Sequence, residues 1–243
     1  MKIAVAGKGG VGKTTIAGTL ARSLARSGHE VLALDADTNP MLGVSVGLGP
    51  ETTDLLVAVR QALQDGEVEH EPTAEGMADT FGADAPDGVR LVVATRIDRF
   101  DSGCLCCGVS PDQLLREFET DGRVVVCDLE AGVGTLMRIK EGQADLVVVV
   151  ANPSAKSIDV ARRALEIAET KARVLLIANR VSGPEDVEAI RVALGRDPDV
   201  IVPEDPVIAT ADRDGEAPID VDAGAPGVLA IQALAERLVP AVA

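Results

Sequence analysis

The chain has 243 residues, a formal net charge of −16 at neutral pH, 47% hydrophobic residues and neither Trp nor Tyr. A chain of this length can bury a substantial core, which Val, Leu, Ile and Ala must supply. The 39 acidic against 23 basic residues argue against nucleic acid as a partner, because non-specific DNA binding needs a positive surface. No apolar run reaches the roughly 18 residues that a membrane span requires, so no membrane partner is expected.

A glycine loop between a strand and a helix is the first feature along the chain. Residues 2–6 form an apolar run, and residues 7–14 match the phosphate-loop pattern G-x-x-x-x-G-K-[ST]. Glycines let successive backbone N–H groups turn toward one anion, which the positive end of the following helix also favours. Lys13 is expected to reach the β- and γ-phosphates, and Thr14 to bind Mg²⁺. The expected nucleotide contacts are Gly9, Gly10, Val11, Gly12, Lys13, Thr14 and Thr15.

A second lysine inside the loop indicates which class of phosphate loop this is. Lys8 directly follows the first glycine, in the sequence GKGGVGKTT. This loop resembles the deviant phosphate loop of the family that contains MinD, ParA, the nitrogenase iron protein and CooC. In that family the extra lysine reaches the partner's nucleotide across a dimer interface. The resemblance implies catalytic roles for Lys8 and Lys13, and a homodimer that forms with ATP.

Two aspartates end the next apolar run, 31–34. Open parallel sheets bind ligands at the carboxyl ends of their strands, so Asp35 and Asp37 are expected near the γ-phosphate and Mg²⁺. In the resembled family this segment is switch I. The resemblance implies that Asp35 holds the water shell of the metal and that Asp37 orients or deprotonates the attacking water. A capping role in the next turn is the alternative for Asp37.

The region that follows combines a helix with an acidic stretch. Apolar residues at helical spacing predict a helix over 53–64. Residues 65–88 are rich in Glu, Asp, Gly, Pro and Ala and show little periodicity. This composition predicts an acidic surface insertion that is poorly ordered or loosely helical.

A cysteine-rich stretch, 101–109, is the second feature that carries chemistry. Cys104, Cys106 and Cys107 lie between two glycines, and thiolates select soft or borderline ions such as Zn²⁺ and Ni²⁺. Adjacent thiolates cannot comfortably share one small ion, and no histidine is near in the sequence. A four-coordinate site would then take its remaining ligands from a second copy of the chain. Cys104 and Cys106 are the favoured ligands, with Cys107 a lesser one.

The combination of these motifs points to a narrower family. The deviant loop, the Asp-x-Asp and the Cys-x-Cys together resemble the CooC-type ATPases, which insert nickel into carbon monoxide dehydrogenase. The resemblance implies ATP, Mg²⁺, a metal cargo, dimerisation with ATP or metal, and a client apo-metalloenzyme. The Cys-x-Cys-Cys spacing also looks like the GCxCC loop of CobW-type GTPase metallochaperones, so metal and client stay open.

The second half of the chain completes the nucleotide motifs. The apolar run 124–128 ends in Asp128, a Walker B pattern whose acid binds Mg²⁺ through water. Residues 129–134 resemble switch II. Asn179 follows another apolar run and matches the family position that contacts adenine. Guanine-specific proteins carry Asn-Lys-x-Asp there, whereas this chain has Asn-Arg-Val-Ser, which favours ATP. The segment that resembles the adenine-cupping loop contains Pro203, Glu204 and Asp205.

Alternating strands and helices predict one ATPase domain over 1–243, an α/β/α three-layer fold with a mostly parallel sheet. The function we infer from the sequence is an ATP-dependent metallochaperone, with nickel or zinc as cargo, in the cytoplasm. An iron–sulfur reductase like the nitrogenase iron protein is one alternative, although no cysteine follows Cys127 to supply its second cluster ligand. A MinD- or ParA-like positioning ATPase is another, which the negative charge disfavours.

Overall fold

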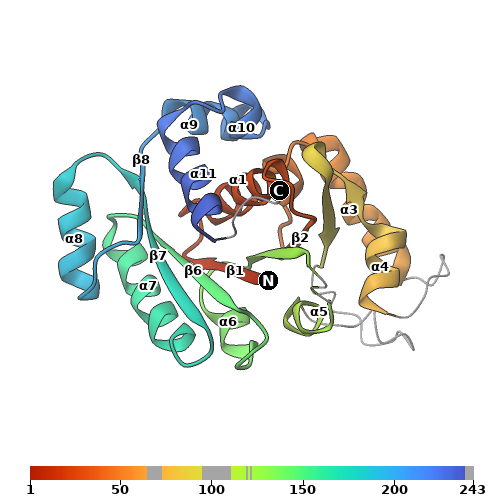
Figure 1. Ribbon diagram of the computed structural model, residues 1–243, viewed down its shortest axis with the longest axis horizontal. Coiled ribbons are helices and arrows are strands. Elements are labelled where there is room, and N and C mark those ends of the chain that lie inside the picture. Colours follow the sequence, from red (N-terminus) through yellow and green to blue (C-terminus); the bar gives the residue numbers. More distant parts are fainter. Residues whose placement is uncertain (65–72, 95–110, 119, 121, 239–243) are drawn as a thin grey trace.

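The computed structural model describes residues 1–64, 73–94, 111–118, 120 and 122–238. Its strands are β1 (Lys2–Gly7), β2 (Val31–Ala36), β3 (Ala83–Asp84), β4 (Val89–Val93), β5 (Val124–Leu129), β6 (Leu146–Ala151), β7 (Arg173–Val181) and β8 (Val200–Pro203). In this described part of the chain they form one eight-stranded sheet in the order β3-β4-β2-β5-β1-β6-β7-β8 (Figure 1). Neighbouring strands are parallel except β3 and β4.

Helices cover both faces of this sheet (Figure 1). They are α1 (Lys13–Arg26), α2 (Leu42–Ser45), α3 (Gly49–Gln64), α4 (Ala74–Phe81), the 3₁₀ turn η1 (Pro86–Gly88), α5 (Pro111–Glu117), α6 (Gly134–Arg138), α7 (Ala155–Ala168), α8 (Pro184–Leu194), α9 (Pro206–Asp214), α10 (Pro218–Val221) and α11 (Pro226–Leu238). The predicted single domain with a mostly parallel sheet and a layer of helices on each side is confirmed. No helix among the described residues has the length and apolar character needed to span a bilayer.

Two apolar clusters, one on each face of the sheet, hold the layers together. On one face, α1, α2 and α11 pack on the sheet through residues that include Ile16, Leu42 and Ile231. On the other face, α4 to α8 pack through residues that include Leu114 and Leu136. Because helices cover both sides, strands such as β6 (LVVVVA) are continuously apolar and fully buried.

The predicted acidic insertion, 65–88, lies partly outside the described residues. Its described part, 73–88, contains α4, β3 and η1. Thr73 caps α4 by accepting a hydrogen bond from the Gly76 N–H, and Met77 and Phe81 lie in the core on the α4 face of the sheet. The helix α4 fits the loosely helical alternative, but this part is not confined to the surface, because a few apolar residues within its acidic sequence pack on the sheet.

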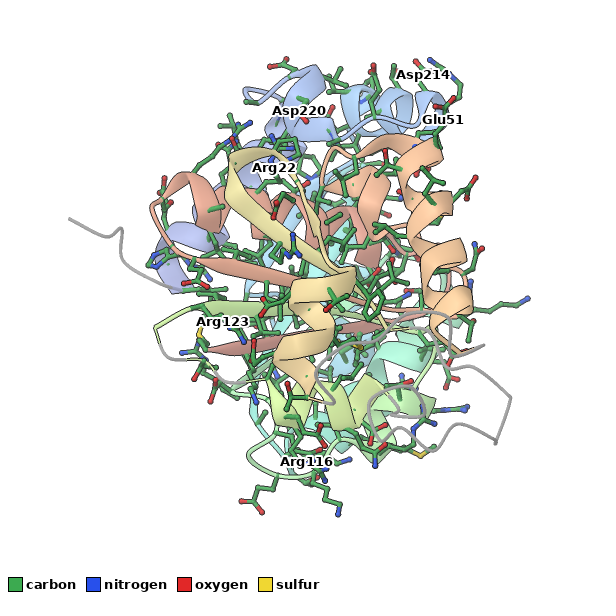
Figure 2. All side chains as sticks on the ribbon, turned by 90° about the vertical axis from the view of Figure 1, so that its right-hand side faces the viewer. Arg22, Glu51, Arg116, Arg123, Asp214 and Asp220 are labelled. Atoms are coloured by element: carbon green, nitrogen blue, oxygen red, sulfur yellow. The ribbon has the colours of Figure 1, made fainter. Side chains whose placement is uncertain are left out.

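A buried arginine fastens α1 to three distant segments (Figure 2). The Arg22 side chain is 1% exposed. Its guanidinium donates to Asp87 at 2.6 Å, to Asp220 at 2.7 and 2.9 Å, and to the Val46 carbonyl at 2.9 Å. A buried charge is tolerated only when its donors are satisfied, and here every nitrogen of the fork has an acceptor. The helix that follows the phosphate loop is thus fixed to the rest of the domain.

Candidate nucleotide-binding site

The phosphate loop lies between β1 and α1, and two glycines in it have no room for a side chain. A Cβ on Gly7 would lie 2.6 Å from the Val150 carbonyl oxygen of the adjacent strand β6. Gly12 precedes α1 in a left-handed conformation, with φ 95°, and a Cβ there would overlap the Asn179 amide. These positions require glycine, which leaves the loop backbone free to face an anion at the start of the helix.

Asn179, at the carboxyl end of β7, holds the loop in place. Its buried Nδ2 donates to the Val11 carbonyl at 2.7 Å. Val11 itself is 1% exposed and packs in the α1-side core. The residue predicted to contact the base is therefore also bonded to the phosphate loop, a link between positions 168 residues apart.

The two lysines of the loop differ in their surroundings. Lys13, the first residue of α1, is 5% exposed. Lys8 is half-buried, and its Nζ donates to the Gly9 carbonyl at 3.1 Å, within the same loop. Gly9 and Gly10 are exposed at the loop tip. The buried lysine is thus positioned beside the anion-binding backbone, while the second lysine lies at the surface.

Two buried carboxylates lie side by side next to the loop. β2 and β5 are parallel neighbours whose register pairs Asp35 with Asp128, and both residues are 0% exposed. Asp35 accepts hydrogen bonds from the Leu42 N–H at 2.7 Å and the Asp37 N–H at 3.2 Å. Asp128 accepts from the Thr14 hydroxyl at 2.6 Å. The three residues predicted to bind Mg²⁺ are thus brought together.

This arrangement shifts the pKa values of both acids upward. Burial raises the pKa of Asp35 well above its usual range, and the nearby Asp128 charge raises it further. Burial also raises the pKa of Asp128 to about 6, against the opposing effects of the Thr14 hydrogen bond and of Lys13. Two carboxylates in one apolar setting favour a cation between or beside them.

A magnesium ion fits these residues. Asp128 Oδ1 is buried and has no hydrogen-bond partner among the described residues, so it is an acceptor without a donor. A hydroxyl and carboxylates are the oxygen ligands that Mg²⁺ takes beside a nucleotide phosphate. Thr14, Asp35 and Asp128 would hold the ion, directly or through its waters. Elsewhere in the described residues, no group of three or more His, Cys, Asp or Glu side chains has a metal-binding arrangement.

The two switch segments meet beside these acids. Asp37 is partly exposed, and its Oδ1 accepts from the Asn39 N–H at 3.0 Å, which closes a tight turn. Thr38 Oγ1 lies 3.3 Å from Glu130 Oε1 in switch II. The Gly132 N–H donates to the Gly7 carbonyl at 2.9 Å and so joins switch II to the base of the phosphate loop.

A cavity of about 210 Å³ opens next to Gly12 and Thr15. Its wall also includes the residues predicted to lie near the adenine base: Asn179, Pro203, Glu204 and Asp205. The Asp205 carboxylate has a structural role, since it accepts hydrogen bonds from the Val207 N–H at 2.8 Å and the Gly227 N–H at 2.7 Å. Glu204 accepts from the Ser182 hydroxyl at 2.9 Å. The cavity has the position expected for a base bound beyond the phosphate loop.

Several residues at the site had not been predicted from the sequence. Further residues in the cavity wall are Ile16, Arg180, Ile208, Ala209, Asp212 and Ile231. Arg180 follows Asn179 at a bulge in β7 and has φ 57°, a left-handed value unusual for arginine. No local pattern marks Ile208, Ala209, Asp212 and Ile231, because the packing of α9 and α11 on the domain brings them to the cavity. Cys104, Cys106 and Cys107 lie outside the described residues, whereas Cys127 is fully buried in β5, as predicted.

Fold and site together define a phosphate-loop nucleotide-binding protein with paired buried acids at the strand ends. The chain belongs to the family of the CobQ/CobB/MinD/ParA nucleotide binding domain, whose model matches residues 2–219. It is an ATPase of this nucleotide-binding family.

Similar proteins agree with this assignment. The carbon monoxide dehydrogenase accessory protein CooC of Rhodospirillum rubrum is 31% identical over 207 residues, which cover 77% of each chain. An uncharacterized ATP-binding protein of Methanocaldococcus jannaschii is 31% identical over 242 residues, or 93% of each chain. Among solved structures, the septum site-determining protein MinD of Pyrococcus horikoshii, complexed with Mg-ADP, has a TM-score of 0.74. That match is 18% identical in sequence and covers 98% of this chain and 96% of that one.

The raised pKa of Asp128 predicts a pH-dependent stability of the nucleotide-free protein. The pKa of this carboxyl is 3.8 in the unfolded chain and about 6 in the folded one, so the folded state binds the proton more tightly. The resulting stabilisation is fully present below about pH 4 and is lost as the pH rises through about 6. Asp128→Asn removes the charge and should raise the free energy of unfolding at pH 7.5 by about 2–3 kcal/mol. At pH 5 the gain should be about half as large. Urea unfolding in chelator measures both values.

Asp197→Asn is the matched control, because the Asp197 side chain is 86% exposed. Its free energy of unfolding should follow that of the wild type at both pH values. A gain for Asp128→Asn that is equal at pH 5 and pH 7.5, or no gain at all, would contradict the electrostatic account of the site.

Proposed function

We propose that this protein is an ATP-dependent metallochaperone that delivers a metal ion, with nickel the favoured cargo, to an apo-metalloenzyme such as carbon monoxide dehydrogenase. The observation that carries the proposal is the triplet Cys104, Cys106 and Cys107 between glycines, in a chain 31% identical to a carbon monoxide dehydrogenase accessory protein. Thiolates in such spacing suit nickel or zinc.

The described residues before the cysteine stretch support a connection with the nucleotide site. Ala94 is the last described residue before it, and its N–H donates to the Asp35 carbonyl at 2.7 Å. Asp35 belongs to the Mg²⁺ ligand set and precedes Asp37 by two positions. A change at the switch I end of β2 is therefore linked by one backbone bond to Ala94, which precedes the cysteine stretch in the sequence.

The proposed chemistry of ATP hydrolysis uses few side chains. Lys13 and the loop N–H groups bind the phosphates. Thr14, Asp35 and Asp128 would hold a magnesium ion, which would supply positive charge against the phosphates. Asp37 orients the attacking water and accepts its proton. Its own turn, closed by the Asn39 N–H, fixes the direction of this carboxylate.

Base selection follows from the orientation of the Asn179 amide. Its Nδ2 is used on the Val11 carbonyl, so the amide oxygen is the atom left to face the cavity. An oxygen acceptor pairs with the exocyclic amino group of adenine and opposes the oxygen that guanine carries at the same position. This supports ATP over GTP.

The second loop lysine predicts dimerisation that depends on ATP. Lys8→Ala should bind ATP through Lys13, Thr14 and the loop amides, because Lys8 contacts only its own loop tip in the described chain. It should lose dimerisation driven by a non-hydrolysable ATP analogue, and about 10²-fold in turnover, because a partner-supplied cation stabilises transferring phosphate charge. Analytical ultracentrifugation and ATPase assays measure these effects.

The control for this experiment is Lys156→Ala, which removes an exposed lysine from α7. It should dimerise and hydrolyse ATP like the wild type. Normal dimerisation and turnover in Lys8→Ala would show that this lysine does not act across an interface.

The cysteine stretch predicts a metal site shared between two chains. Since two adjacent thiolates cannot comfortably bind one small ion, Cys104 and Cys106 from each of two chains would supply four donors. Metal analysis of anaerobically purified protein should find one nickel or zinc ion per two chains. Metal should also promote dimerisation, because a ligand that binds only the dimer stabilises it.

Alanine at Cys104 or Cys106 should abolish metal binding and leave ATP affinity unchanged. Cys127→Ala is the control, since that thiol is fully buried in the core and should affect only packing. One tightly bound ion per single chain, insensitive to dilution, would rule out the shared site and favour a loop closed within one chain, as in the CobW pattern.

A further inference from the structure

A single hydroxyl connects the two switch segments of the nucleotide site. Thr38 Oγ1, in switch I, lies 3.3 Å from Glu130 Oε1, in switch II, and 3.5 Å from Asp37 Oδ1. A threonine hydroxyl has one proton to donate, so it satisfies one of these two carboxylates at a time. The shorter distance assigns the proton to Glu130.

Asp37 does not depend on this hydroxyl for a donor. Its Oδ1 already accepts from the Asn39 N–H at 3.0 Å. The Thr38 hydroxyl therefore donates to Glu130 and not to Asp37, whose carboxylate is proposed to position water. The same bond fixes the Thr38 side chain, and with it the turn that orients Asp37.

Both sides of this bond are attached to rigid parts of the fold. Glu130 directly follows β5, and Gly132 donates to the Gly7 carbonyl at 2.9 Å. On the other side, the Asp37 N–H donates to the buried Asp35 carboxylate at 3.2 Å. Thr38 itself is exposed. Among the described residues, its hydroxyl bonds to a side chain of another segment through Glu130.

We propose that Glu130 is a positioning residue for ATP hydrolysis, which acts through the Thr38 hydroxyl to hold Asp37 in its working orientation. This inference rests on the role given to Asp37 in the proposed function. The path runs from the base of the phosphate loop, through Gly132 and Glu130, to Thr38 and Asp37. Because a small misplacement of a water-positioning group reduces the rate of the chemical step, the bond affects kcat rather than nucleotide binding.

Steady-state ATPase kinetics of five variants test the proposal. Thr38→Val and Glu130→Ala each break the bond and should lower kcat roughly 10-fold while KM for ATP changes less than about 2-fold. The double variant should lose no more than either single one, because both remove the same interaction. Thr38→Ser keeps the hydroxyl and Glu130→Gln keeps an acceptor oxygen, so both should restore most of the wild-type kcat.

Two variants, one on α7 and one in the turn that follows it, serve as controls. Thr170→Val removes an exposed hydroxyl that donates to the Ile167 carbonyl, and Glu166→Gln neutralises an exposed glutamate. Both should have wild-type kcat and KM, which separates the expected effect from a general loss of a hydroxyl or a charge.

Each other outcome overturns the proposal. If Glu130→Gln is as slow as Glu130→Ala, the carboxylate itself takes part in the chemistry. If the losses of the single variants multiply to roughly 100-fold in the double variant, the two residues act separately. If Thr38→Val has a wild-type kcat, the bond has no role in turnover.

The role of Asp37 is tested in the same series. Full activity of Asp37→Ala would remove the residue through which Glu130 is proposed to act, and so would overturn this inference too. Failure of the metallochaperone proposal is distinguishable, because metal binding by the wild type and by the cysteine variants is measured without ATP turnover.

Discussion

Two carboxylates buried against each other at the ends of parallel strands are the constraint on which the nucleotide site depends. Asp35 and Asp128 are paired in the register of β2 and β5, and neither is exposed to solvent. Both pKa values are raised, Asp128 to about 6, so the nucleotide-free site carries unfavourable charge at neutral pH. A cation bound with the nucleotide would relieve this cost, and the ligand would then be coupled to the segments that the two acids hold.

Those segments are the ones that must respond to ATP. The Asp35 carboxylate accepts from the backbone N–H groups of Asp37, in switch I, and of Leu42, the first residue of α2. Asp128 precedes switch II and accepts from Thr14 in the phosphate loop. In the proposed function, binding of ATP with a cation therefore acts on both switches at once. Through β2 it also acts on β4, the strand that precedes the cysteine stretch in the sequence.

Sequence reasoning predicted the parts of this site that are local. The phosphate loop needs only a strand, a glycine pattern and a helix in succession, and all of these are contiguous. Asp35 and Asp128 were both expected at the Mg²⁺ site, because parallel strands end at one edge of the sheet, but their adjacency depends on the pairing of β2 with β5, which the sequence does not give. The Thr38–Glu130 contact joins two loops that are 92 residues apart in the sequence, so no periodic pattern predicts this contact.

The errors and omissions have a common physical origin. The packing of Met77 and Phe81 on the sheet was not predicted, because these residues lie in an acidic stretch and their packing partners are remote in the sequence. The base cavity takes Ile208 and Ile231 from helices whose position depends on the whole fold. Asn179 was predicted as a base contact, and its bond to the phosphate loop became visible only in three dimensions.

The proposed function requires that ATP control the affinity of the protein for a metal ion. The most direct measurement is the dissociation constant of Ni²⁺, obtained by competition with a chromophoric chelator, with a non-hydrolysable ATP analogue and again with ADP. The account predicts that the two constants differ by roughly 10-fold or more, since linked sites in proteins couple by about 1–3 kcal/mol. Equal nickel affinities in the two nucleotide states would contradict it.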